Sequence, residues 1–153
     1  MPPPGWAAGW GAPAPGDALS AVRDARHVRW RFDHAPIARS RHLLVTDPDD
    51  RHLLAWFATQ VEGDVLLVRD FWSEDADRAV GLPYLDALLH AARRAGHASI
   101  SVEIAARDSR LSTWQARGFI ARSRRPVFGI QRDEGGGAIG QDDLYLTAAD
   151  EDE

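Results

Sequence analysis

The chain contains neither cysteine nor lysine, and it has no long apolar run. Without cysteine, disulfide frameworks and thiolate zinc sites are excluded. A membrane-spanning helix needs about 20 consecutive apolar residues, and no stretch of the sequence approaches that length. The segment Met1–Trp6 has neither the basic start nor the apolar centre of a secretory signal. We therefore expect a soluble, cytoplasmic protein without membrane contacts.

The composition divides the chain into a leader, one domain and a short tail. Residues 1–16 combine proline, glycine, alanine and tryptophan, a composition that favours a flexible leader. Residues 149–153 are mostly acidic and are expected to stay solvated as a tail. The 153 residues suit a single domain, so we expect that domain to span residues 17–148.

The first part of this domain shows one helical pattern followed by three strand-like runs. Asp17 is a suitable N-cap for a helix that extends to about Phe32. The strand-like runs are Arg41–Thr46, His52–Val61 and Val65–Trp72. Only short turns separate these runs, so antiparallel pairing is expected.

The second part alternates helices with strands. Leucine and alanine recur with helical spacing before Gly96, which is suited to end that helix. A strand is expected at Ala98–Ile104, and a second helix, capped by Asp108 or Ser109, is expected to end at Gly118. The last strand candidates are Phe119–Arg124, Val127–Arg132 and Leu144–Thr147, with a mobile loop over residues 133–143.

These elements predict an α+β fold. A helix separates the strand that starts at Val65 from the strand that starts at Ala98, and a right-handed crossover makes such strands parallel. The expected architecture is therefore a mixed, mainly antiparallel central sheet flanked by helices on both faces.

The turn after the third strand carries the most informative motif, Arg78-Ala79-Val80-Gly81-Leu82-Pro83. Backbone N–H groups in a turn that opens a helix, together with the positive end of the helix dipole, can hold an anion. Gly81 is expected to supply a special backbone conformation, and Pro83 is expected to be the first helical residue. The segment is a candidate diphosphate-binding loop, and a solvated turn is the alternative interpretation.

This motif resembles the Arg/Gln-x-x-Gly-x-Gly/Ala signature of the GNAT superfamily of acyl-CoA-dependent N-acyltransferases, and it departs from that signature only at Pro83. The segment Ala116–Phe119 resembles the family's helix that ends in Gly-Phe before a strand. Residues 22–32 and Leu144–Thr147 are similar to a GNAT-like module that forms the second half of tandem-domain acyltransferases. A tandem or homodimeric GNAT lobe is therefore an open alternative.

The resemblance implies a GNAT-like fold over about residues 17–147 and an N-acetyltransferase mechanism. Acetyl-CoA, the acyl donor, would lie where the third and fourth strands of this segment splay apart. Its diphosphate would bind residues 78–83, and its pantetheine arm would pair with strand backbone. A small-molecule or peptide amine would then attack the thioester directly, and the protein would supply proximity and proton transfer.

No catalytic acid or base is assigned. Trp114 stands at the helix position where many family members carry a proton-donating tyrosine, and Pro83 lacks an N–H. Asp70 and Glu103 are candidate bases, although solvated or ion-paired carboxylates are the more common alternative. Tyr145 is a candidate displaced acid or a core residue. A catalytically silent GNAT-like domain, serving as a structural or ligand-binding lobe, is the second hypothesis.

Other site classes find no support in the sequence. The six histidines show no metal-ligand spacing, so no metal is expected. No Gly-x-Ser-x-Gly elbow marks a covalent nucleophile. The net charge of −5 weighs against a nucleic-acid partner, and the arginine clusters are interpreted as solvated faces. Trp30, Trp56 and Trp72 are interpreted as core residues.

Overall fold

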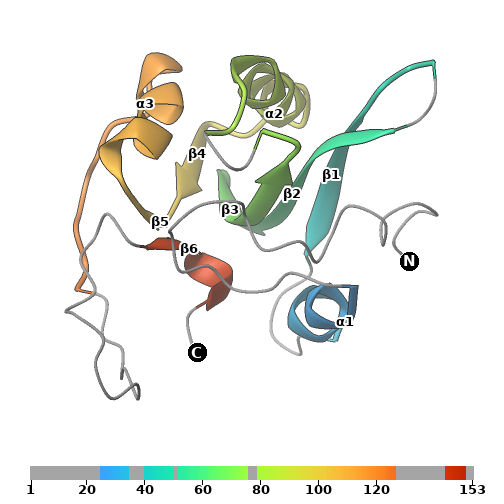
Figure 1. Ribbon diagram of the computed structural model, residues 1–153, viewed down its shortest axis with the longest axis horizontal. Helices are drawn as coiled ribbons and strands as arrows, with labels where there is room; N and C mark the ends of the chain where they lie inside the picture. Colours follow the sequence, from blue (N-terminus) through green and yellow to red (C-terminus); the bar gives the residue numbers. More distant parts are fainter. Residues whose placement is uncertain (1–24, 35–39, 50–51, 76–78, 127–143, 151–153) are drawn as a thin grey trace.

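The computed structural model describes residues 25–34, 40–49, 52–75, 79–126 and 144–150 (Figure 1). The expected leader, the strand at residues 127–132 and the loop at residues 133–143 lie outside these residues. The elements in chain order are α1 (Ala25–Val28), η1 (Arg29–Asp33), β1 (Arg41–Thr46), β2 (Leu53–Glu62), β3 (Val65–Ser73), α2 (Leu82–Arg94), β4 (Ser99–Val102), β5 (Ile104–Ala106), α3 (Asp108–Ala116), β6 (Tyr145–Thr147) and η3 (Ala148–Asp150).

The four longer strands form one sheet in the order β1-β2-β3-β4. The pairs β1–β2 and β2–β3 are antiparallel, whereas β3 and β4 are parallel. The sheet is therefore mixed and mostly antiparallel, and the fold class is α+β. The three strand-like runs and the parallel crossover expected from the sequence are confirmed.

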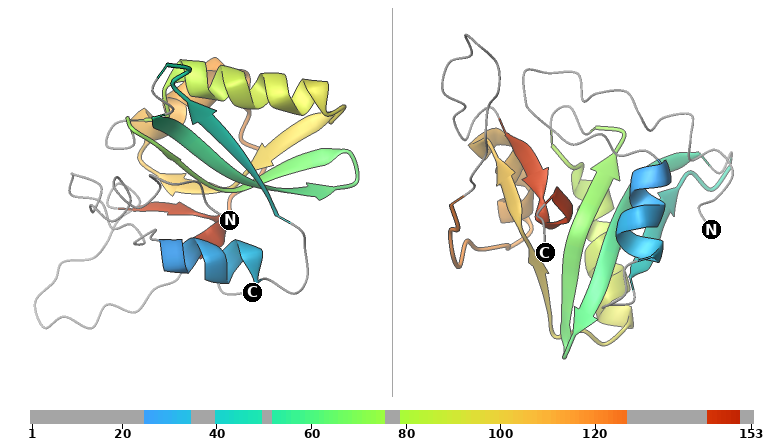
Figure 2. Two further views of the ribbon diagram at one scale, coloured as in Figure 1. Left: turned by 90° about the vertical axis from the view of Figure 1, so that its right-hand side faces the viewer. Right: turned by 90° about the horizontal axis from the view of Figure 1, so that it is seen from below.

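Helical elements cover both faces of this sheet, as β2 shows most clearly. Successive side chains of a strand point to opposite faces, so Trp56 and Phe57 belong to different sides. Phe57 belongs to the core that includes Leu85 and Leu88 of α2, and Trp56 belongs to the core that includes Phe32 of η1. The expectation of helices on both faces is confirmed (Figure 2).

Helix α2 follows the sequence pattern at both the core and the C-terminus. Leu85, Leu88 and Ala92 are its buried residues, which are three positions of the predicted apolar stripe. Gly96 has a φ of 81°, a left-handed conformation that glycine adopts without steric cost. The predicted end of this helix is confirmed.

Three expectations about local structure are wrong. Residues 120–126 are exposed and form no strand, and no strand among the described residues lies opposite them. Neither Asp108 nor Ser109 caps α3, because the helix begins at Asp108 and Arg107 takes the N-cap position. Trp30 is 64% exposed, because η1 directs Phe32 rather than Trp30 toward the sheet.

The chain end packs onto the domain further than expected. Ala149 is 5% exposed and belongs to the core with Phe32 and Trp56. The carboxylate of Asp150 accepts a hydrogen bond from the Thr147 N–H at 2.8 Å. Residues 149 and 150 therefore belong to the fold rather than to a solvated tail, because burial and hydrogen bonding hold them there.

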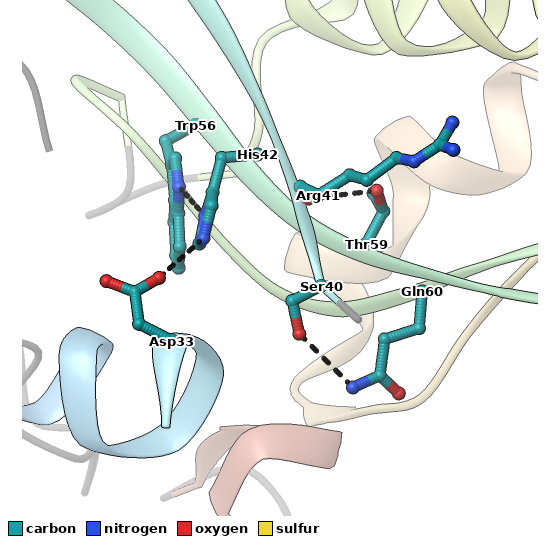
Figure 3. A network of polar contacts seen from close by, with 7 residues as sticks. All are labelled: Asp33, Ser40, Arg41, His42, Trp56, Thr59 and Gln60. Carbon is teal, nitrogen blue, oxygen red and sulfur yellow. Dashed lines mark hydrogen bonds and ion pairs between the residues drawn. The ribbon is translucent and has the colours of Figure 1, made fainter. Parts of the chain in front are cut away.

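A histidine joins η1 to the edge strand β1 (Figure 3). The indole Nε1–H of Trp56 donates to His42 Nδ1 at 3.0 Å, and His42 Nε2 lies 3.5 Å from an Asp33 carboxylate oxygen. An accepting Nδ1 carries no proton, so the Nε2 of the neutral ring carries it and faces Asp33. This arrangement requires neutral His42.

Acidification is therefore expected to weaken the fold through His42. Burial lowers the pKa of His42 below 6.5, and this effect outweighs the opposing attraction and hydrogen bond of Asp33. The folded state then binds fewer protons than the unfolded state. The contribution of neutral His42 to the free energy of unfolding is therefore fully present above pH 6.5, and it is lost as the pH falls through the pKa of the folded state.

The variant His42→Asn tests this expectation, because its amide oxygen still accepts from Trp56 and it does not titrate. We expect the melting temperature of the native chain to fall more between pH 7 and pH 5 than that of the variant. Equal decreases in both proteins would contradict the role given to His42.

Candidate functional site

Strand β3 extends beyond its parallel partner. The β3–β4 ladder runs from the pair Val65–Ser99 to the pair Val68–Val102 and then ends, although β3 continues to Ser73. The predicted strand at residues 98–104 is broken at Glu103, and the chain continues as β5, which pairs with β6 instead. Residues 69–73 of β3 thus have no strand partner on this side among the described residues.

The separation of the two sheets is visible in the ribbon. In the right-hand view of Figure 2, β4–β5 and β3 meet at one end and diverge toward the other. Within this stretch the β2–β3 register shifts, since Ala58 pairs with Asp70 and Thr59 with Val68. Arg69 is the additional residue of a β-bulge, which is a common feature where pairing ends.

Aromatic side chains lie along the diverging edge on the α3 side. The ring centroid of Phe71 is 5.2 Å from that of Trp114 and 6.0 Å from that of Tyr145. Trp114 is 3% exposed and also contacts Phe119 edge-on at 5.0 Å. Trp114 is therefore a core residue that packs α3 against β3.

Tyr145 is a tyrosine whose ring contacts this part of β3. Its ring packs against Phe71, and the guanidinium carbon of Arg110 lies 4.2 Å from its centroid. The residue is half-buried, so both a rim position and the candidate role as a displaced acid stay open.

Asp70 is a buried link between β3 and the C-terminal elements. Asp70 is 0% exposed. Its Oδ1 accepts hydrogen bonds from Phe71 N–H and from Thr147 Oγ1, both at 2.9 Å. Through Thr147 the link continues to Asp150. The alternative of a solvated carboxylate is wrong for Asp70. Glu103, the other candidate base, is exposed and forms an ion pair with Arg125.

The N-terminus of α2 lies after the end of β3 in the chain, as the sequence predicts, but its details differ. Arg78 lies outside the described residues, Ala79 is half-buried, and Val80 is 1% exposed within the core. Gly81 is the N-cap with φ −59° and ψ 142°, a conformation open to any residue. The expectation of a special backbone conformation at Gly81 is therefore wrong.

Space, rather than backbone angles, restricts the residue at Gly81. A Cβ atom at this position would lie 2.9 Å from Asp75 Oδ2 and 3.2 Å from the ring of Tyr84. Both distances are shorter than ordinary van der Waals contact, so a side chain here would displace a neighbour.

The first turn of α2 offers few donors to an anion. Pro83 is the second helical residue rather than the first, and it has no N–H. The N–H groups of Tyr84 and Leu85 both point to the Gly81 carbonyl, at 3.0 and 3.3 Å. Leu82 N–H has no partner among the described residues, so it remains the donor at the positive end of the helix.

Two carboxylates lie beside this turn. The Tyr84 hydroxyl donates to Glu74 Oε1 at 2.5 Å, and Asp75 lies against Gly81. Burial raises the pKa of Tyr84, and the hydrogen bond to Glu74 and the charges of Glu74 and Asp75 raise it further. Tyr84 therefore stays protonated, and the described part of the loop is negatively charged.

Searches of protein-family models, of curated proteins and of solved structures find no match for this chain. Within the described residues, no group of three His, Asp or Glu side chains is placed to hold a metal ion. The described helices include none with the length and apolarity needed to cross a membrane.

Proposed function

We propose that this protein is an N-acyltransferase that moves an acyl group, with acetyl-CoA as the donor, to a small-molecule or peptide amine. One observation carries the proposal: β3 continues past Val68, its last residue that pairs with β4, and leads through a short loop to the N-terminus of α2. A strand edge without a ladder partner can pair with an extended amide-containing chain, as pantetheine is. The adjacent helix N-terminus attracts a diphosphate.

In the proposed reaction the amine nitrogen forms a bond to the thioester carbonyl carbon, and the carbon–sulfur bond breaks. The ammonium proton passes to a base or to water, and the thiolate takes a proton as it leaves. The chain contributes mainly proximity, by holding the donor along residues 69–73 and Leu82. Trp114 has no acidic proton, so Tyr145 is the candidate donor to the thiolate.

A catalytically silent GNAT-like lobe is the second candidate function. Two observations favour the silent lobe. Trp114, at the position where the family often has its acid, is buried, and the carboxylates of Glu74 and Asp75 lie beside the candidate diphosphate-binding loop. Such a lobe would pack against a tandem or homodimeric partner, or bind its ligand without turnover.

The test is a thermal shift with millimolar acetyl-CoA, followed by an assay of CoA release with a panel of amines. A ligand at about 100 times its Kd stabilises the folded state by about 2.7 kcal/mol, which corresponds to a rise of several degrees. Gly81→Val should abolish the shift relative to its own ligand-free melting temperature, because the added side chain would crowd Asp75 and Tyr84.

The outcomes separate the two functions. A shift together with CoA release supports the transferase. A shift without release for any amine supports a silent ligand-binding lobe. Absence of a shift in the native chain overturns both acyl-CoA roles.

A further inference from the structure

We infer that Arg110 is a positioning residue for the proposed acyl transfer: its guanidinium holds the ring of Tyr145 beside β3 and favours loss of the phenolic proton to the leaving thiolate. This inference rests on the proposed function and deepens it. It gives a role to an arginine that lies in the interior, where a charged side chain is costly to bury.

The guanidinium of Arg110 lies over the face of an aromatic ring. Arg110 is 5% exposed and stands on α3 one turn before Trp114, which is also buried. Its guanidinium carbon is 4.2 Å from the centre of the Tyr145 ring. A cation over an aromatic face is attracted to the ring, and the attraction is stronger where water is excluded. The contact therefore holds the guanidinium and the ring together.

Phe71 places this pair beside the part of β3 that extends beyond β4. The Phe71 ring lies 5.2 Å from that of Trp114 and 6.0 Å from that of Tyr145. The last pair of the β3–β4 ladder is Val68–Val102, so Phe71 belongs to the stretch along which the acyl donor is proposed to lie. Tyr145 is half-buried, whereas Trp114 is closed off from water. Tyr145 is therefore the accessible ring of this cluster.

The charge of Arg110 acts among other charged groups of the elements around β6. These groups are Arg69 and Asp70 in β3, Asp108 and Arg110 in α3 and Asp150 in η3, with none in β5. The carboxylates of Asp70 and Asp150 both accept hydrogen bonds from Thr147, two positions along β6, and they oppose a negative charge on the phenol. Arg110 is the group over the ring, and its positive charge favours the phenolate.

The proton transfer balances without a further co-reactant. The amine nitrogen forms a bond to the thioester carbon, the carbon–sulfur bond breaks, and sulfur keeps the electron pair as the CoA thiolate. The Tyr145 hydroxyl gives its proton to this sulfur, and the phenolate that forms lies beside the guanidinium. The positively charged nitrogen of the new amide then loses a proton, which returns to the phenolate through water.

Ionisation of Tyr145 can be measured directly, because the chain contains two tyrosines and no cysteine. Burial raises the pKa of the other tyrosine, Tyr84, and its hydrogen bond to Glu74 raises it further. Tyr84 therefore stays protonated where an ordinary tyrosine titrates, at about pH 10. Phenolate absorbance followed against pH should show one transition in this range. Tyr145→Phe should remove that transition, which assigns it.

We expect the neutral variants Arg110→Gln and Arg110→Met to raise the midpoint of this transition by roughly one pH unit. Arg110→Lys keeps the positive charge and should stay close to the native chain. Arg117→Gln is the matched control, because it removes the same charge at the other end of α3, where Arg117 pairs with Asp86. Circular dichroism at each pH verifies the fold. An unchanged midpoint in both neutral variants, or an equal rise in Arg117→Gln, would overturn the inference.

The rate of CoA release against pH tests the role in transfer. The rate should fall at high pH as Tyr145 loses its proton, and in Arg110→Gln this fall should move to higher pH by the same amount as the absorbance midpoint.

The results distinguish this inference from the proposed function. If the native chain releases CoA but the fall in rate does not follow the midpoint of Tyr145, the inference fails and the proposed function stands. If the midpoint responds to Arg110 but no amine gives CoA release, the proposed function fails, and the role of Arg110 in transfer fails with it.

Discussion

Replacing Trp114 with alanine is expected to lower the free energy of unfolding by about 3 to 5 kcal/mol. The residue is 3% exposed, and its indole contacts the rings of Phe71 and Phe119 with centroid distances of 5.2 and 5.0 Å. Truncation would remove these contacts and leave a cavity between α3 and β3. Urea unfolding followed by circular dichroism measures the loss.

Trp114→Phe is the matched control, because it keeps an aromatic ring at the position. It should cost clearly less than Trp114→Ala, since part of the packing with Phe71 survives. A loss below about 1 kcal/mol for Trp114→Ala would contradict the assignment of this residue to the core.

Replacing Asp70 with alanine is expected to lower the free energy of unfolding by about 2 to 4 kcal/mol. Asp70 is 0% exposed, and its Oδ1 accepts from both Phe71 N and Thr147 Oγ1. Removal of the carboxylate leaves two buried donors, Phe71 N–H and Thr147 Oγ1, without this acceptor. An unsatisfied buried donor lowers the free energy of unfolding by more than a hydrogen bond contributes to it on balance. The link between β3 and β6 is lost at the same time.

A double-mutant cycle with Thr147→Val isolates this link. Thr147→Val alone should cost about 1 kcal/mol, and the two changes together should cost less than the sum of their separate effects. Additive losses would show that Asp70 and Thr147 do not act on each other. Asp70→Asn should be milder than Asp70→Ala, because its amide oxygen still accepts.

The elements with a strong local pattern could be predicted from the sequence. Apolar residues recur with a regular period in these elements, as in the strands β1 to β3 and in the stripe of Leu85, Leu88 and Ala92. Such a period can be recognised in the sequence without knowledge of the fold. Gly96 could be predicted as a helix end, because a left-handed residue after a helix strongly favours glycine.

The features that shape the candidate site depend on contacts between distant segments. Glu103 fits the alternation of one continuous strand, and only the pairing of β5 with β6 breaks that strand. The partner of Asp70 is 77 residues away in the chain, and nothing near Asp70 in the sequence indicates Thr147. The reason for Gly81 was likewise missed, because the approach of Asp75 is visible only in the fold.

The placement of the motif between a strand and a helix is therefore confirmed, whereas the backbone role expected of Gly81 and the first helical position expected of Pro83 are wrong. The loop does lead from β3 to a helix N-terminus, and Leu82 N–H donates to no acceptor among the described residues. The carboxylates of Glu74 and Asp75 beside it were visible in the sequence, but their approach to the helix end was not.

The most direct test of the proposed acyl-CoA site is to record amide chemical shifts of the ¹⁵N-labelled chain while acetyl-CoA is added to millimolar concentration. The site predicts progressive shifts at Leu82 and along residues 69–73, with the amides of the β2–β3 turn unchanged. Shifts confined to other elements, or no shifts at all, would contradict the proposed binding of acyl-CoA along the part of β3 that extends beyond β4.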